Sequence, residues 1–196
     1  MGSITRTIAN NLTTGKGTGG FEKLSGPTTA TSVSVVDLTL STDYKIFKLV
    51  IDQIEPAVDG GLFRCRFSVD GGSSFIDSAN TYSWVTQGVA GSSGDYTEHN
   101  SKATNYGGLT KAALGDQGDE GGAGVLEIIP NRSGLSNVKG NYYNYLGYRQ
   151  DTTNTYRGMV SQGKVETSGN DIDAVRVFFD NGNIETITYT LYGVKN

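Results

Sequence analysis

The alternation of hydrophobic and polar positions is clearest near the C-terminus. Two segments repeat hydrophobic residues at every second position: Val175, Val177 and Phe179 in the first, and Ile187, Tyr189 and Leu191 in the second. This period is that of a β-strand with one buried face. Residues 180–183 between them form a turn sequence, in which we expect Gly182 at positive φ. The pattern predicts a hairpin over residues 172–194, with Phe179 and Leu191 in the core.

Comparable strand patterns recur through the rest of the chain. They cover residues 33–40, 44–52, 62–69, 75–85, 125–130, 141–148 and 157–166. Turn sequences such as Asp70-Gly71-Gly72 separate them, and residues 44–85 have the pattern of an antiparallel meander. About eight strands and no clear helix predict an all-β fold, an antiparallel β-sandwich of jelly-roll-like type.

Glycine is the most unusual feature of the composition. The chain has 28 glycines and 3 prolines in 196 residues. Each interior glycine costs a helix about 1 kcal/mol relative to alanine, so this composition suits short strands and tight turns. Many of the glycines fall in residues 86–124. This Gly-rich excursion either lies at a functional face or contains short strands, and Leu109 to Leu114 has the pattern of one helical turn.

The first 32 residues differ from the rest. Residues 1–32 are polar and rich in Thr, Gly and Asn. We interpret them as an extended N-terminal arm, either a disordered tail or a segment that orders on a neighbouring subunit or another particle protein. The sandwich domain then comprises residues 33–196.

The charge pattern excludes several classes of partner. Charged residues make up 18% of the chain and the net charge is −4, so there is no basic footprint for nucleic acid. No apolar run approaches the ~18 residues of a membrane-spanning helix, and residues 1–14 do not resemble a signal peptide. We expect synthesis in the cytoplasm, no membrane insertion and no nucleic-acid partner. The neutral-polar surface suits contacts with proteins or carbohydrate.

Candidate catalytic residues are few. His99 is the only histidine and lies beside Glu98 in a Gly/Ser-rich segment, and Cys65 is the only cysteine, in an alternating strand. One Cys and one His do not make a structural zinc site. No phosphate-binding loop is present, and no carboxylate pair is singled out by its spacing for glycoside hydrolysis. The sequence therefore predicts a protein that is not an enzyme and has no cofactor.

Two clusters remain as candidate binding sites. Asp116, Asp119 and Glu120 lie in a Gly-rich segment and offer the oxygen ligands that calcium takes, although a solvated acidic loop is the alternative. The second cluster is aromatic and comprises Tyr142, Tyr143, Tyr145, Tyr148 and Trp84.

Tyrosine combines contact area with a polar tip, which suits recognition surfaces. In a strand, Tyr143 and Tyr145 would share one face and Tyr142 would lie on the other. The cluster is therefore a candidate for ligand or subunit contacts, or alternatively for core packing.

The C-terminal segment resembles the closing segment of tailed-bacteriophage virion proteins. The resemblance lies in the strand Ile172-Asp173-Ala174-Val175-Arg176, the turn Gly182-Asn183-Ile184 and the ending Leu191-Tyr192-Gly193-Val194-Lys195. It covers roughly an eighth of the chain, and residues 1–125 have no such resemblance. It implies a β-sandwich or jelly-roll on the virion surface, often a homotrimer, without enzyme activity.

The resemblance and the composition together predict a non-enzymatic virion structural protein, assembled in the host cytoplasm. We expect a tail-fibre or receptor-binding type, with a possible host-surface glycan as ligand. A capsid decoration (cement) protein or head fibre is the alternative of the same class. A carbohydrate-binding module is the alternative of another class, because the tyrosine cluster and Trp84 also suit saccharides.

Overall fold

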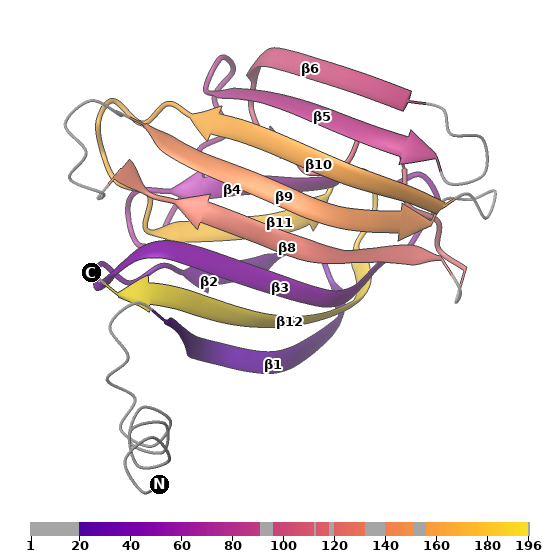
Figure 1. Ribbon diagram of the computed structural model, residues 1–196, viewed down its shortest axis with the longest axis horizontal. Helices are drawn as coiled ribbons and strands as arrows, with labels where there is room; N and C mark the ends of the chain where they lie inside the picture. Colours follow the sequence, from indigo (N-terminus) through magenta and orange to yellow (C-terminus); the bar gives the residue numbers. More distant parts are fainter. Residues whose placement is uncertain are drawn as a thin grey trace, which may run out of the picture.

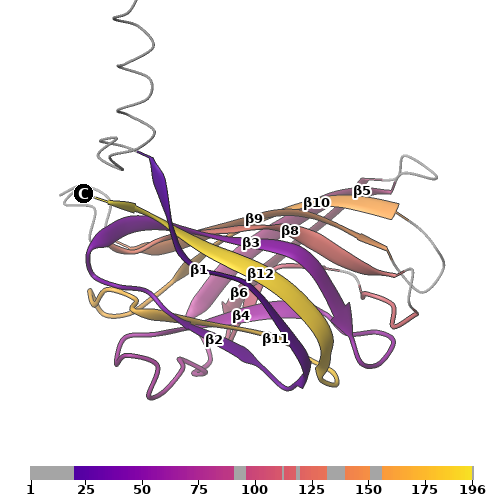
Figure 2. The same ribbon diagram turned by 90° about the horizontal axis from the view of Figure 1, so that it is seen from below.

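The protein is an antiparallel β-sandwich, so the predicted all-β fold is confirmed. The computed structural model describes residues 20–90, 96–111, 113–117, 120–131, 140–150 and 156–195. Within these ranges the chain forms an eight-stranded sheet and a four-stranded sheet that pack against each other, with no α-helix. Figures 1 and 2 show the large sheet as one layer and the small sheet as the other. No helix in this part of the chain is long and apolar enough to span a membrane.

The strands follow a fixed spatial order in each sheet. The large sheet contains, in order, β1 (Phe21–Val33), β12 (Ile184–Lys195), β3 (Tyr44–Pro56), β8 (Gly121–Ile129), β9 (Asn141–Gln150), β10 (Tyr156–Val165), β5 (Tyr82–Ala90) and β6 (Tyr96–Thr104). The small sheet contains β2 (Val36–Thr39), β11 (Ala174–Phe179), β4 (Phe63–Ser68) and β7 (Gly107–Gly108).

Eight of these strands have jelly-roll topology. The row β1-β12-β3-β8 faces the row β2-β11-β4-β7, so the chain alternates between the two sheets as two interleaved Greek keys require. The other four strands form two antiparallel pairs, β5 with β6 and β9 with β10. β9 pairs with β8, and β5 pairs with β10, so both pairs extend the large sheet beyond β8, as Figure 1 shows. The insertions make one layer twice as wide as the other.

The prediction that the two C-terminal strands pair with each other is wrong, but the prediction of which of their residues are buried is correct. β11 pairs with β2 and β4, whereas β12 pairs with β1 and β3 in the other sheet. The chain thus crosses between layers at residues 180–183, where Gly182 has φ 74° as expected. Phe179 and Leu191 are both in the core. Alternation of hydrophobic and polar residues identifies the buried face of a strand. A turn sequence does not distinguish a hairpin within one sheet from a connection between two sheets.

The predicted meander over residues 44–85 is wrong for the same reason. β3 and β5 belong to the large sheet, and β4 between them belongs to the small sheet. The segment predicted as a strand from residue 75 onward becomes a strand at Tyr82. Residues 70–76 instead fold back over the small sheet, where the Ile76 amide donates to the Phe67 carbonyl at 2.9 Å.

The sandwich begins earlier than predicted. Residues 21–33 form β1, which pairs with β12 along its length, so the boundary at residue 33 is wrong. β1 is an edge strand with mostly exposed Thr and Ser side chains, and only Leu24, Ala30 and Val33 pack against the core. It therefore lacks the alternation by which a half-buried strand is recognised. The remainder of the predicted arm, residues 1–19, lies outside the described residues.

Much of the Gly-rich excursion is regular structure. Residues 86–90 complete β5, residues 96–104 form β6, and residues 121–124 begin β8. The described residues between Leu109 and Leu114 form no helical turn. The Leu109 and Thr110 amides both donate to the Phe63 carbonyl, which holds this segment against the start of β4.

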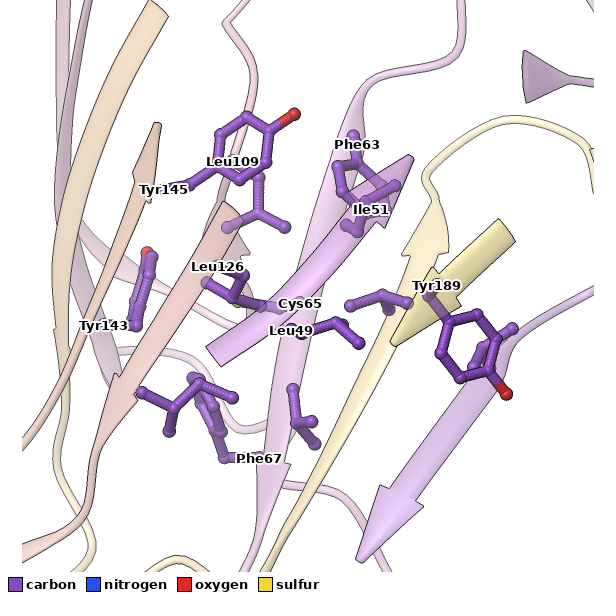
Figure 3. Packing of buried hydrophobic residues seen from close by; sticks show 14 of the residues in the cluster. Leu49, Ile51, Phe63, Cys65, Phe67, Leu109, Leu126, Tyr143, Tyr145 and Tyr189 are labelled. Atoms are coloured by element: carbon purple, nitrogen blue, oxygen red, sulfur yellow. The ribbon is translucent and has the colours of Figure 1, made fainter. Parts of the chain in front are cut away.

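Aromatic side chains fill much of the space between the layers. Phe63 packs edge-on against Tyr145 with ring centroids 6.0 Å apart, and Phe67 packs against Tyr143 at 5.7 Å. Figure 3 shows these rings pointing from the two sheets into the common core around Leu126. Burying each such side chain stabilises the fold by roughly 1.5–3 kcal/mol.

Candidate binding groove on the large sheet

The tyrosines of β9 divide between the two faces of the large sheet. Tyr143 and Tyr145 face inward and are 0% and 1% exposed, whereas Tyr142 and Tyr148 are on the outer face. Trp84 on β5 also packs inward and is 5% exposed. Of the five aromatic residues proposed as contacts, Tyr143, Tyr145 and Trp84 are thus buried and pack in the core. Tyr142 and Tyr148 are the two on the outer face.

Glycines make room for the buried rings. Gly163 on β10 lies opposite Tyr143, and a Cβ atom there would collide with the Tyr143 ring. Gly108 on β7 lies beneath Trp84, where an added Cβ would be 2.7 Å from the indole ring. The Tyr145 hydroxyl donates to the Ala123 carbonyl at 3.2 Å, and burial raises the pKa of Tyr145. These inner tyrosines therefore contribute to the packing of the core and do not contact a ligand on the outer face.

A shallow groove crosses the outer face of the inserted strands. Its volume is about 630 Å³ and it lies over β6, β5, β10 and β9, with Ile129 at the end of β8. Two rows of residues in direct cross-strand register form it: Lys102, Ser83, Lys164 and Tyr142 in one, and Asn100, Val85, Gln162 and Asn144 in the other. We call this surface the amide groove.

The lining of the amide groove is mostly apolar by area, and three side-chain amides and two lysines, Lys102 and Lys164, interrupt it. Asn100, Asn144 and Gln162 each offer an amide that both donates and accepts hydrogen bonds. Lys164 forms an ion pair with Glu166, and this contact raises the pKa of Lys164, so the side chain stays protonated. Such a lining matches a ligand rich in hydroxyl groups, and the volume lies in the range of small-molecule sites.

An apolar row adjoins the amide groove. Val50, Val125, Leu146 and Val160 lie opposite one another on β3, β8, β9 and β10, and we call them the apolar stripe. Leu146 is 64% exposed and Val160 is 42% exposed. In the next row, Tyr148 and Val89 flank Gly158 and are also exposed. Contiguous exposed apolar groups of this kind mark contact surfaces.

The two candidate catalytic residues lie in unlike environments. His99 is exposed on β6, with its ring 5.2 Å from the Trp84 ring. Cys65 is fully buried in β4, and burial raises the pKa of its thiol. A buried, protonated thiol is a poor nucleophile, so Cys65 acts as a small core side chain.

The acidic cluster gains a member that the sequence did not suggest. Carboxylate oxygens of Asp59, Asp116 and Glu120 lie within 4.8 Å of one another. Asp59 comes from the turn after β3, and its Oδ1 accepts the Asp116 amide at 3.1 Å. Asp119 lies outside the described residues. Three carboxylates at this spacing have the donor set for Ca²⁺, and exposed acidic groups also cluster without one.

Compared with known proteins, the chain matches no family model, and no curated protein or solved structure is significantly similar to it. Function is therefore inferred from the topology and from the outer face of the large sheet. The amide groove was not predictable from the sequence, because it forms where β10 pairs with β5, two strands that lie far apart in the chain. The sequence singled out two of the residues that line the groove, Tyr142 and Trp84.

Proposed function

We propose that this chain is a non-enzymatic surface protein of a tailed-bacteriophage virion, of the tail-fibre or receptor-binding type. In this proposal the amide groove contacts a glycan of the host surface. The observation that carries it is the groove itself, a volume of about 630 Å³ on the outer face of the large sheet whose mostly apolar lining includes three side-chain amides.

The lining of the groove supports a saccharide as ligand. Sugar hydroxyls donate and accept at once, and the side chains of Asn100, Asn144 and Gln162 do the same. Tyr142 adds an aromatic surface with a polar tip at the edge of the groove. Because the groove residues stand on paired strands rather than on loops, little ordering entropy is lost on binding.

The topology supports the particle context. Jelly rolls with two Greek keys are the architecture of many viral capsid proteins and lectins. A fold alone does not imply a function, so this support is an analogy. The jelly-roll topology agrees with the resemblance of residues 172–195 to closing segments of phage virion proteins. Within this segment, residues 174–179 form β11 of the small sheet and residues 184–195 form β12 of the large sheet.

The apolar stripe favours a second candidate, a capsid decoration protein or head fibre. Leu146 and Val160 are large, exposed and adjacent, which suits packing against another protein subunit. In that case the stripe, and not the amide groove, would be the functional surface. A homotrimer is expected for both virion candidates.

One set of measurements separates these possibilities. We expect the chain to bind on a glycan array, and Gln162→Ala to weaken that binding at least tenfold. Gln53→Ala, also exposed on the outer face but outside the groove, is the matched control and should leave binding unchanged. Light scattering should give a trimer.

Other outcomes assign the chain differently. Absence of glycan binding together with a trimer that Leu146→Asp dissociates would favour the decoration protein. A monomer that binds glycan would favour a carbohydrate-binding module. A monomer without glycan binding would overturn the proposed function.

A further inference from the structure

Three arginines gather on the outer face of the small sheet, on the side of the sandwich opposite the amide groove. Arg64 and Arg66 come from β4, and Arg176 comes from β11. The strand register places Arg176 directly opposite Arg66 on one side and directly opposite Asp37 of β2 on the other. Like charges facing each other across a pair of strands destabilise a sheet unless they are compensated.

Two of the three arginines are compensated within the chain. Arg176 donates from Nε and Nη2 to the two carboxylate oxygens of Asp37, both at 2.7 Å, and its guanidinium lies 4.1 Å from the Phe75 ring. Arg64 is buried, donates from Nη2 to Asp180 and lies 4.5 Å from the Tyr106 ring.

Arg66 has no such carboxylate partner among the described residues. Its Nε donates to the Asn105 carbonyl at 3.0 Å, and its guanidinium lies 5.1 Å from the Phe178 ring. Neither contact neutralises the charge. Within the described residues no hydrogen bond reaches its two Nη groups, and the side chain is half-buried.

The fold therefore presents a guanidinium that is oriented before any ligand arrives. The Nε hydrogen bond and the Phe178 ring fix the guanidinium plane, which leaves the Nη edge as a rigid fork of donors. That fork matches the two oxygens of a carboxylate, and such paired, charge-assisted hydrogen bonds are among the strong ones. Because the guanidinium is already held, little side-chain entropy is lost when the anion binds.

We propose that Arg66 binds the carboxylate of a small ligand through Nη1 and Nη2. A singly charged group fits better than a phosphate dianion, because Asp37 lies beside Arg176 and the chain carries a net charge of −4. The site is on the opposite sheet from the amide groove and does not depend on the proposed function.

The test is a titration of the full chain followed by NMR of the arginine side chains. Glucuronate and acetate supply the carboxylate with and without a sugar ring, and glucose supplies the ring alone. We expect both carboxylates, but not glucose, to shift the Arg66 Nε signal, with a dissociation constant on the order of 1 mM. The Nε signal of Arg64, whose side chain is buried and held to Asp180 through Nη2, is the internal reference.

Substitutions of Arg66 test whether its two Nη groups bind the carboxylate. Arg66→Gln should weaken glucuronate binding at least tenfold, and Arg66→Lys, which keeps the charge but loses the fork, should weaken it nearly as much. Lys23→Gln removes one exposed positive charge from β1 and should leave the affinity unchanged. Equal unfolding midpoints for the parent and both Arg66 variants show that folding is intact.

The results also separate the sources of the carboxylate. Tighter binding of glucuronate than of acetate assigns an acidic sugar, and equal binding assigns the carboxylate alone; both support the proposal. Binding of glucose as strong as that of glucuronate, failure of both carboxylates to bind, or undiminished binding in folded Arg66→Gln overturns it.

Discussion

The guanidinium of Arg64 lies 3.2 Å from the carboxylate of Asp180, from Nη2 to Oδ2. Arg64 belongs to β4, and Asp180 is the first residue of the turn that carries the chain from the small sheet to the large one. The other oxygen of Asp180, Oδ1, accepts the Leu62 amide at 2.9 Å. One carboxylate thus fixes the crossing segment to the start of β4 and neutralises a side chain that is only 4% exposed.

We expect Asp180→Ala to destabilise the fold by about 2–3 kcal/mol. The substitution leaves the buried Arg64 charge without its counter-charge, which costs more than losing an exposed pair. The figure is below the full cost of a broken buried pair because the Asp180 side chain is 33% exposed. Urea unfolding at neutral pH measures the difference.

The control for this prediction is an exposed ion pair. Lys195→Gln breaks the pair with Glu22, whose two side chains are half or more exposed, and should change the unfolding midpoint little. If Asp180→Ala is as mild as Lys195→Gln, Arg64 is not a buried charge that depends on Asp180.

A pair of leucines tests the assignment of inner and outer faces. Leu191 on β12 is 3% exposed and belongs to the core, whereas Leu146 on β9 is 64% exposed in the apolar stripe. We expect Leu191→Ala to cost about 2–5 kcal/mol, because it leaves a cavity. Leu146→Ala should change stability by no more than about 0.5 kcal/mol. Chemical denaturation of both variants gives the two values, and similar costs would contradict the faces described here.

Two glycines of β10 test the packing of the inner tyrosines. A Cβ atom at Gly163 would collide with the Tyr143 ring, while one at Gly158 would meet nothing within 4 Å. Gly163→Ala should therefore destabilise by about 1–3 kcal/mol through overpacking and should alter the near-ultraviolet circular dichroism of tyrosine. Gly158→Ala, the same change five residues earlier, should be neutral or stabilising. An undisturbed Gly163→Ala would show that Tyr143 is not held against β10.

The sequence identified most strands and their buried faces, because period-two alternation is a local signal. Val175, Val177 and Phe179 were assigned to the core from this signal, and they are buried. Alternation does not report which strand lies next to which, so β11 and β12 were placed in one hairpin although they belong to different sheets. The edge strand β1 was missed because its side chains are mostly exposed.

The candidate sites depend even more on long-range pairing. Arg66 and Arg176 become neighbours through a register that joins residues more than a hundred positions apart, and the same holds for Arg64 and Asp180. Asp59 joins Asp116 and Glu120 only because the turn after β3 meets the segment before β8. The tyrosines of β9 were the exception, since their division between two faces follows from alternation alone.

Acid stability tests the turn after β4. The Asp70 carboxylate accepts hydrogen bonds from the Ser74 hydroxyl and amide and from the Ser68 hydroxyl. The bonds from Ser74, followed by that from Ser68, lower the pKa of Asp70 from 3.8 to about 2. A carboxyl group whose pKa is lowered by folding stabilises the native state above its unfolded pKa and loses that contribution as the pH falls through the folded value.

For Asp70 this loss should occur between about pH 4 and pH 2. We expect Asp70→Asn to be less stable than the parent at pH 6, and the difference to shrink as the pH falls to 2. Ser74→Ala should show a smaller version of the same behaviour, because it removes the hydroxyl donor and leaves the amide in place. Thermal unfolding midpoints measured from pH 2 to pH 6 compare the three proteins. If the difference between Asp70→Asn and the parent stays constant over this range, the hydrogen bonds to the ionised Asp70 carboxylate do not stabilise the folded state.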